Sequence, residues 1–211
     1  EKLDGQNDFE LLTIDENKRK SKIERKNALN AADIAILCLP DEAAKEAVEM
    51  VVNDNTRIID ASTAHRTTHG WVYGFPEYQA GQEKLIGNAT RVTNPGCYAV
   101  ASIAILKPLI DFGILPRDWP ISINGVSGYS GGGKQLISAF ENDENGELHD
   151  TNFFNYGLLL DHKHVPEITY WSGLKNKPIF SPSVGRFYQG MMVQVPIHFS
   201  ALPSSPTYKQ I

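Results

Sequence analysis

The chain has 211 residues, a net charge of -5, 41% hydrophobic residues and 21% charged residues. These values are ordinary for a soluble globular protein, and the length allows one large domain or two small ones. No apolar run predicts a membrane-spanning helix, and the negative charge argues against a nucleic-acid groove, which normally has a clustered basic surface. Two cysteines form no disulfide framework and no signal peptide is seen, so we expect a protein of a reducing compartment, the cytoplasm or an organelle stroma, and choose the cytoplasm.

The first part of the chain alternates apolar runs with polar, helix-like segments. We predict strands at residues 9–14, 33–40 and 57–60, a charged and partly helical connection at 15–30, and a helix from Asp41, as its cap, to about Val52. The run at 33–40 is continuously apolar, which is typical of a strand buried on both faces. Strand, helix and strand at this spacing predict a doubly wound, Rossmann-like parallel sheet. If residues 9–14 form its second strand, the first strand and a glycine-rich phosphate loop precede Glu1.

The pattern of apolar and polar residues changes after residue 96. An apolar helix is expected over residues 99–106, and strands are expected at 121–126, 178–184 and 191–199. The last of these alternates apolar and polar residues, as antiparallel strands do when one face is buried. We therefore predict an α/β dinucleotide-binding domain at residues 1–96. An α+β catalytic domain with a mostly antiparallel sheet should follow at 97–211.

A thiol stands where the predicted apolar helix begins, in Asn94-Pro95-Gly96-Cys97-Tyr98. The positive end of a helix dipole favours the thiolate, and the preceding Pro and Gly permit a sharp turn with room for a substrate. A base for this nucleophile is available in the segment from His162 to Glu167. The two histidines of that segment have no further ligands nearby in the sequence, which argues against a metal site. Cys38 lies in an apolar run and is expected to be a small core residue.

Two further stretches allow two interpretations each. The segment Ser127 to Lys134 contains four glycines, two serines and a lysine. Such a loop suits either a phosphate cradle or a flexible surface, and it is not a P-loop because Gln135 follows the lysine. The basic residues 18–20 either hold the 2′-phosphate of NADP or form a solvated charge run.

Taken together, these blocks resemble the N-acetyl-gamma-glutamyl-phosphate reductase family, most closely its shorter bacterial subtype. The resemblance rests on residues 94–98, 127–134 and 162–167, and also on 60–66, 73–77 and 182–187. The blocks follow the family's order over nearly the whole chain. The family's glycine-rich loop is expected before Glu1, and a helix that closes over the nicotinamide is expected after Ile211. Val100 stands where the larger subfamily usually has Thr.

The resemblance implies an NADPH-dependent reduction of an acyl phosphate in arginine biosynthesis. Cys97 attacks the acyl carbon, phosphate leaves, and hydride reduces the resulting thioester to N-acetylglutamate semialdehyde. His162 is the first choice as acid–base partner, with His164 close behind. Glu167 is expected to orient an imidazole or to contact the substrate.

The resemblance also implies binding residues and an oligomer. Substrate-binding residues are expected at His164, Glu167, Arg66, Lys134, Arg186 and Asn94. Residues bordering NADP(H) are expected at Cys38, Leu39, Pro40, Ser62, Ser127, Gly128 and Gly132. The family implies a homo-oligomer, either a dimer or a tetramer.

Three other interpretations of the sequence remain open at this point. The first is a related acyl-phosphate reductase, such as aspartate-semialdehyde or glyceraldehyde-phosphate dehydrogenase. The second is a cysteine hydrolase or acyltransferase that uses no nicotinamide. The third is a non-catalytic fragment that assembles with a partner.

Overall fold

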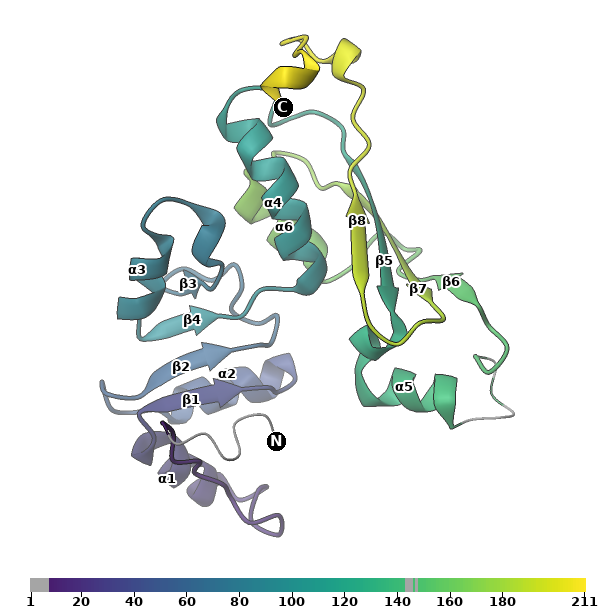
Figure 1. Ribbon diagram of the computed structural model, residues 1–211. Helices are drawn as coiled ribbons and strands as arrows, with labels where there is room; N and C mark the ends of the chain where they lie inside the picture. The colour runs from purple at the N-terminus through teal and green to yellow at the C-terminus, as the bar shows by residue number, and fades with distance from the viewer. Residues whose placement is uncertain (1–7, 143–145, 147) are drawn as a thin grey trace. The chain divides into compact units, whose positions relative to one another are not determined.

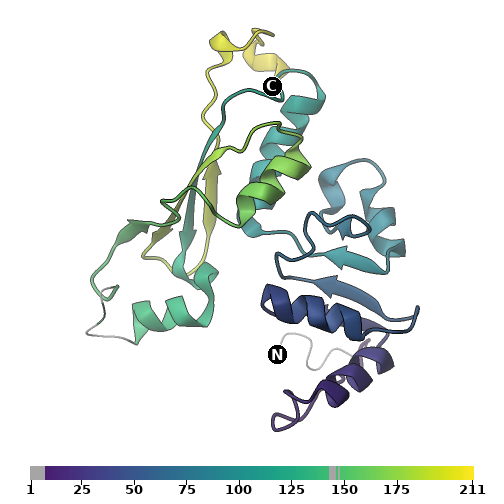
Figure 2. The ribbon, with the colours of Figure 1, turned by 180° about the vertical axis from the view of Figure 1, so that it is seen from behind.

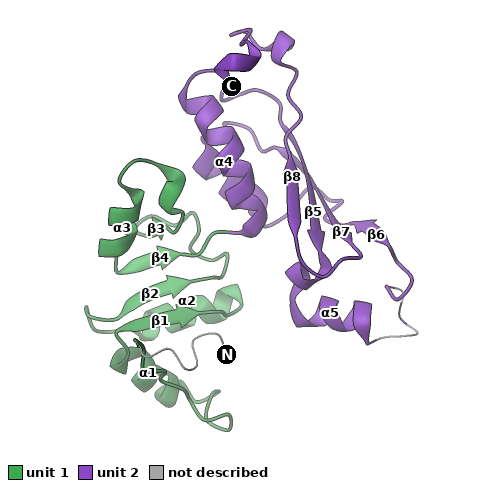
Figure 3. Ribbon diagram, in the orientation of Figure 1, with its two compact units in different colours: residues 1–95 green, residues 96–211 purple. Residues whose placement is uncertain are grey.

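A computed structural model describes residues 8–142, 146 and 148–211. The chain forms two compact units, residues 1–95 and residues 96–211 (Figure 3). Each unit contains its own sheet of four strands. None of the helices in the described ranges is both long and apolar enough to cross a membrane.

The first unit is built on a parallel sheet. Its helices are α1 (Lys22–Ala31), α2 (Asp41–Met50) and α3 (Gln82–Asn88), and its strands are β1 (Ile34–Leu37), β2 (Arg57–Asp60), β3 (Val72–Tyr73) and β4 (Arg91–Thr93). The strand order is β1-β2-β4-β3 and every pairing is parallel. Helices α1 and α2 lie on the same face of this sheet (Figures 1 and 2). Ala47 of α2 packs there against Leu37 and Ile58, and the predicted Rossmann-like architecture is confirmed.

Three local predictions for this unit were wrong. Residues 9–14 form no strand, and Phe9 and Leu12 are 60% and 49% exposed, since their backbone has no partner strand in the described part of the chain. Strand β1 is buried on one face only, with Ile36 54% exposed. Asp41 is the first residue of α2 and not its cap; its carboxylate instead accepts hydrogen bonds from the backbone N–H and the hydroxyl of Thr63.

The second unit is built on a mixed sheet. Its helices are α4 (Cys97–Asp111), α5 (Gly133–Glu141) and α6 (His164–Ser172), and its strands are β5 (Ser122–Gly128), β6 (Phe153–Asn155), β7 (Ile179–Gly185) and β8 (Met191–Gln194). The strand order is β6-β7-β5-β8. Both outer strands pair antiparallel, as predicted, whereas the longest pairing, β5 with β7, is parallel, so the sheet is mixed. A parallel pair needs a long crossover, which α5, β6 and α6 supply.

The start of α4 is packed closely onto this sheet. The ring of Tyr98 meets that of Phe180 edge to face at 5.2 Å, and its hydroxyl donates to the carbonyl of Ser183 at 3.2 Å. Gly125 of β5 allows this approach, because a Cβ there would lie 2.5 Å from the Tyr98 ring. The first turn of α4, which begins with Cys97, is therefore fixed relative to β5 and β7. Helix α6 lies beside α4 in both views (Figures 1 and 2).

Candidate active site

Cys97 is the first residue of α4 and its side chain is exposed. The N-terminal end of a helix presents unpaired N–H groups and a partial positive charge, which favour a thiolate. Gly96 is the cap residue, and it supplies no side-chain hydrogen bond to the helix. Its backbone, at φ -71° and ψ 141°, is a conformation open to any residue, so the turn itself does not require glycine. The predicted placement of an accessible thiol at a helix start is seen directly.

Glu167 supplies the cap that Gly96 lacks. Its carboxylate accepts the N–H of Gly96 at 2.8 Å, and the residue is only 2% exposed. The arrangement is that of a capping box, in which a carboxylate binds the backbone N–H of the cap residue, except that here the carboxylate comes from another helix. Sequence analysis expected Glu167 to orient an imidazole or to contact the substrate. The structure shows that it holds the backbone directly ahead of Cys97.

Two substitutions of Glu167 separate the effect of its side-chain length from the effect of its charge. Glu167→Gln keeps an acceptor oxygen at the same distance, whereas Glu167→Asp keeps the charge but shortens the side chain by one methylene. If the carboxylate positions the turn, kcat should fall by about 100-fold in the Asp variant and by less than about 5-fold in the Gln variant, since a displacement of about 1 Å can cost this much. Steady-state kinetics of the full-length protein measures both.

A matched control for these variants is Ser172→Ala, at the other end of α6. Ser172 is 1% exposed and its hydroxyl has no hydrogen-bond partner among the described residues, so its loss should leave kcat within about 2-fold. A Gln variant that is more impaired than the Asp variant would show that the charge of Glu167, and not its reach, is what matters.

The two predicted histidines lie side by side at the start of α6. His164 is the first residue of the helix and is 5% exposed, while His162 is half-buried just before it. The backbone N–H of His164 donates to Nδ1 of His162 at 3.1 Å, and the ring centroids are 4.8 Å apart. Burial, and then the positive charge of Lys163, lower the pKa of His162 below its ordinary value. The neutral imidazole is therefore the resting form at neutral pH.

Two tyrosines connect the thiol to His162. Tyr98, which follows Cys97 in α4, has its ring centroid 6.4 Å from that of His162. Tyr156, in the loop after β6, meets the His162 ring at 5.7 Å, and its backbone N–H donates to the carbonyl of Pro182 at 3.1 Å. Burial raises the pKa of Tyr156 strongly, and the neighbouring Tyr98 and Cys97 act in the same direction. The structure thus brings Cys97 and His162 into one neighbourhood.

Sequence reasoning missed Tyr156. It stands in Phe153-Phe154-Asn155-Tyr156, where two phenylalanines precede it, so the sequence gives no reason to single out this aromatic residue. Its position depends on the loop between β6 and α6, and no spacing rule predicts that position. With its pKa raised, its hydroxyl keeps its proton at and well above neutral pH. It is therefore a hydrogen-bond donor beside the ring of His162.

The other predicted substrate residues of the second unit lie differently. The Arg186 guanidinium donates to the backbone carbonyls of Leu148 and His149 and lies 5.6 Å from the centre of the Phe140 ring. It therefore fastens its own loop. Lys134 is exposed in the first turn of α5, and among the described residues no hydrogen bond or ion pair joins it to the neighbourhood of Cys97.

The glycine-rich stretch 127–134 is not an open loop. Ser127 and Gly128 complete β5, residues 129–132 form a short 3-10 helix, and α5 begins at Gly133. The N–H of Gly128 donates to the carbonyl of Gly190 at 2.9 Å, and a Cβ at Gly128 would lie 2.6 Å from the carbonyl oxygen of Phe187. Glycine is needed here because two backbone segments approach closely.

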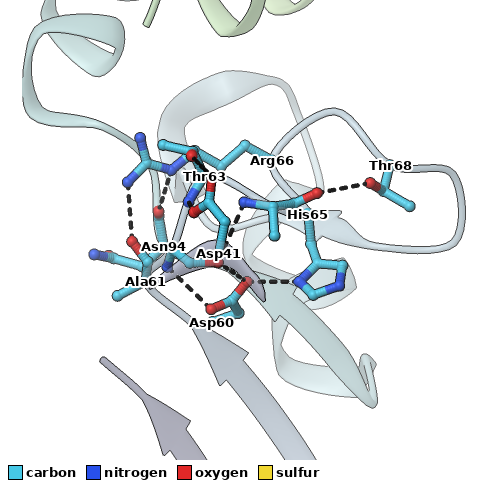
Figure 4. Close-up of polar contacts among 10 residues, drawn as sticks. Asp41, Asp60, Ala61, Thr63, His65, Arg66, Thr68 and Asn94 are labelled. Carbon is cyan, nitrogen blue, oxygen red and sulfur yellow. Dashed lines mark hydrogen bonds and ion pairs between the residues drawn. The ribbon is translucent and has the colours of Figure 1, made fainter. Parts of the chain in front are cut away.

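In the first unit, a buried polar cluster follows β2 (Figure 4). Asp60, the last residue of β2, is 0% exposed. Its carboxylate accepts from the N–H of Ser62 at 3.0 Å and from the Ser62 hydroxyl at 2.7 Å. It also lies 2.6 Å from Nδ1 of His65, whose ring stacks on Trp71 at 4.1 Å. One carboxylate thus fixes the backbone and two side chains of the loop after β2.

Arg66 ties this loop to the segment ahead of Cys97 (Figure 4). Its Nε donates to the carbonyl of Asn94 at 3.2 Å, and a terminal nitrogen donates to the carbonyl of Ala61 at 3.0 Å. The N–H of Asn94 in turn donates to the carbonyl of Asp60 at 2.7 Å. Arg66 is 8% exposed, so the contacts that the structure shows for it are those of a buried brace between two strand ends.

The predicted cofactor residues of this unit lie where β1 and β2 end. Cys38, Leu39 and Pro40 follow β1 and are exposed, so Cys38 is not the core residue that its apolar surroundings suggested. It falls one residue beyond the strand, where side chains are no longer covered. Ser62 follows β2 and is buried, with its hydroxyl engaged by Asp60. Both groups lie at the carboxyl ends of parallel strands, where doubly wound sheets bind ligands.

Comparison with known proteins agrees with this architecture. Residues 4–86 match the family model "Semialdehyde dehydrogenase, NAD binding domain", and residues 97–210 match "Semialdehyde dehydrogenase, dimerisation domain". Over all 211 residues, the chain is 50% identical to the N-acetyl-gamma-glutamyl-phosphate reductase of Burkholderia lata and 52% identical to that of Brucella ovis. The chain belongs to this family of semialdehyde dehydrogenases. It covers 66% and 68% of those two proteins, about two thirds of their length.

Solved structures show the same fold at much lower identity. Aspartate semialdehyde dehydrogenase II from Vibrio cholerae, complexed with ASA, superposes with a TM-score of 0.59 at 15% identity. The match covers 82% of this chain and 59% of that one. The enzyme from Francisella tularensis gives a TM-score of 0.52 at 13% identity, over 82% of this chain and 61% of that one. At this identity the likeness concerns the fold of the family, and the two-domain architecture predicted from the sequence is confirmed.

Proposed function

We propose that the full-length protein containing this chain reduces N-acetylglutamyl 5-phosphate to N-acetylglutamate 5-semialdehyde with NADPH, in arginine biosynthesis. The observation that carries this proposal is the exposed thiol of Cys97 at the start of α4, in a chain half identical to reductases of that name. The capping carboxylate of Glu167 and the neighbouring His162 support it, because a nucleophile needs a fixed position and polar groups around the reacting carbonyl.

The chemistry proceeds through sulfur. The Cys97 thiolate attacks the acyl carbon, a C–S bond forms, and the bond from carbon to the phosphate oxygen breaks, leaving a thioester. A nicotinamide cofactor, when bound, supplies the hydride. Hydride addition to the thioester carbon is followed by loss of the thiolate, which yields the aldehyde and regenerates Cys97. The helix start and the cap at Gly96 keep the sulfur at the same point through both steps.

The residues at the strand ends fit a nicotinamide cofactor. Cys38, Leu39 and Pro40 are exposed at the carboxyl end of β1, and the first unit matches a family of NAD-binding domains. We assign residues 38–40 and Ser62 to this binding edge. For Ser127, Gly128 and Gly132 of the second unit, a cofactor contact stays a prediction from the family resemblance. NADP is our choice of dinucleotide. Of the basic residues that were considered for its 2′-phosphate, Arg19 lies 3.5 Å from Glu16, so charge pairing already accounts for part of that run.

Domain roles and assembly follow from the same assignment. Residues 1–96 would bind the dinucleotide, and residues 97–211 would carry the nucleophile and the subunit contacts. The match of the second unit to a dimerisation-domain family supports a homo-oligomer. We place the enzyme in the cytoplasm, because reducing conditions there keep both thiols free and its acyl-phosphate substrate is a small molecule.

The decisive assay runs the reaction backwards. The full-length protein is mixed with N-acetylglutamate semialdehyde, NADP and phosphate, and NADPH is followed by its absorbance. We expect NADPH formation that requires phosphate, because phosphate must cleave the thioester on Cys97. Aspartate semialdehyde and glyceraldehyde 3-phosphate serve as competing substrates. Turnover without phosphate would indicate an ordinary aldehyde dehydrogenase, and preference for aspartate semialdehyde would indicate a different member of the superfamily.

A further inference from the structure

The orientation of the His162 ring limits which nitrogen carries its proton. A backbone N–H can only donate, and that of His164 points at Nδ1 of His162 from 3.1 Å. Nδ1 must therefore be the bare, accepting nitrogen, and the proton of the neutral ring resides on Nε2. A second proton at Nδ1 would face the N–H of His164, which opposes the imidazolium form. The lowered pKa of His162, caused by burial and then by Lys163, agrees with a ring that stays neutral.

The other nitrogen of the ring, Nε2, is left for a ligand, and the ring lies among the side chains that surround the start of α4. Nε2 makes no hydrogen bond with the described part of the chain, and it is not among the buried polar atoms that lack a partner. The ring lies between Phe180 at 5.0 Å, Tyr156 at 5.7 Å and Tyr98 at 6.4 Å, which hold it from several sides. Tyr98 is the residue that follows Cys97, and Tyr156 interacts electrostatically with the same cysteine.

We propose that His162 acts through Nε2–H as a hydrogen-bond donor to the acyl oxygen of the substrate, and does not act as the base that removes the proton of Cys97. This refines the proposed function and rests on it. A base would have to accept a proton through a bare nitrogen, and the only bare nitrogen of this ring is occupied by the N–H of His164. A neutral imidazole that donates is the better match to an oxygen that becomes negative twice in the reaction.

The electron balance of the reaction requires no proton from His162. In the first step the C–S bond forms while the carbonyl oxygen becomes an anion, which collapses as phosphate leaves with the electrons of its C–O bond. In the second step hydride adds, the same oxygen becomes negative again, and the carbonyl reforms as the thiolate leaves. The phosphate takes its proton from water. The Nε2–H group stabilises the oxygen anion in both steps without being consumed.

Two substitutions of His162 distinguish a donor from a base. In His162→Gln the amide nitrogen reaches the position of Nε2, whereas in His162→Asn it reaches only that of Nδ1. As a donor, His162 should be replaced far better by Gln: we expect kcat to fall about 100-fold or more in the Asn variant. The Gln variant should retain at least about 10-fold more activity. Lys177→Gln, at an exposed position beyond α6, is the control and should stay within about 3-fold of wild type.

A measurement without substrate separates this inference from the proposed function. Iodoacetamide alkylation of Cys97, read by peptide mass spectrometry so that Cys38 is scored separately, reports the resting thiol. As a donor to the substrate oxygen, His162 leaves this rate unchanged, so both variants should be alkylated as fast as wild type at pH 7. If alkylation falls about 10-fold in both variants and both lose kcat equally, His162 is the base and the inference is overturned.

The tautomer is also observable directly. In the full-length protein labelled with ¹⁵N-histidine, with His162→Gln used to assign the signal, Nδ1 of His162 should resonate as a bare nitrogen and Nε2 as a protonated one at pH 7. This measurement tests the tautomer of His162 even if the protein reduces a different acyl phosphate. The opposite pattern, with the proton on Nδ1, would overturn the assignment.

Discussion

Replacing Cys97 with serine should abolish phosphate-dependent NADPH formation, with a loss of about 10⁴-fold or more in kcat. Serine occupies nearly the same volume at the exposed start of α4, so the cap from Glu167 to Gly96 should persist. A hydroxyl is far less acidic than a thiol, and the helix dipole is too weak to ionise it near neutral pH. An ester would also accept hydride less readily than a thioester. Stopped-flow and steady-state absorbance of NADPH measure the loss.

Asp111→Asn is a suitable control for the same helix. It breaks only an exposed ion pair, Lys107 with Asp111 at 2.8 Å, and should leave kcat within about 2-fold. Thermal unfolding of both variants should match that of wild type to within a few degrees. A serine variant that keeps more than about one hundredth of the wild-type rate would show that the reaction does not pass through an acyl adduct on Cys97.

Elements whose signals are local could be predicted from the sequence. The Pro and Gly ahead of an apolar run placed the start of α4 near Cys97. The apolar runs placed β2, β5 and β7 to within two residues, and β1 to within three. Family membership was predicted from six short blocks and is confirmed by relatives matched over the whole chain. These features depend on neighbouring residues or on composition, which a linear pattern records.

Features that depend on distant pairing could not be predicted. Residues 9–14 have the composition of a strand, but a strand exists only where another backbone pairs with it. The parallel pairing of β5 with β7 required knowing the path of the crossover between them. The link from Glu167 to Gly96 spans 71 residues and depends on how α6 lies against α4. No periodicity carries information of that kind.

The same distinction applies to charge. Arg66 and Arg186 were assigned to anionic groups of the substrate because they are cations in family blocks. In the structure, both guanidinium groups donate to backbone carbonyls of their own units. Sequence shows that a charge is present, whereas the direction of its hydrogen bonds emerges only from the fold. Their contact with substrate stays a prediction, and the shown contacts are with the loops that carry other site residues.

Replacing Asp60 with alanine should lower the free energy of unfolding of the first unit by about 3 kcal/mol. The carboxylate is fully buried, and its removal leaves the Ser62 N–H, the Ser62 hydroxyl and Nδ1 of His65 without their acceptor. Ser62 and His65 are only 7% and 9% exposed, so water can replace little of what is lost while the loop stays closed. Hydrogen exchange of the β2 amides, measured by mass spectrometry, reports the stability of this unit separately from the second one.

The predicted loss of stability comes from the polar atoms that lose their acceptor. A control variant and a double variant test this explanation. Asp54→Ala changes an exposed carboxylate in the turn before β2 and should shift stability by less than about 0.5 kcal/mol. The double variant Asp60→Ala with His65→Ala should be destabilised by at least about 1 kcal/mol less than the sum of the single variants, because their contact is then counted once. Strict additivity would show that His65 and Asp60 do not depend on each other. The loop that carries Arg66 toward Asn94 would then be held mainly by the two hydrogen bonds to Ser62.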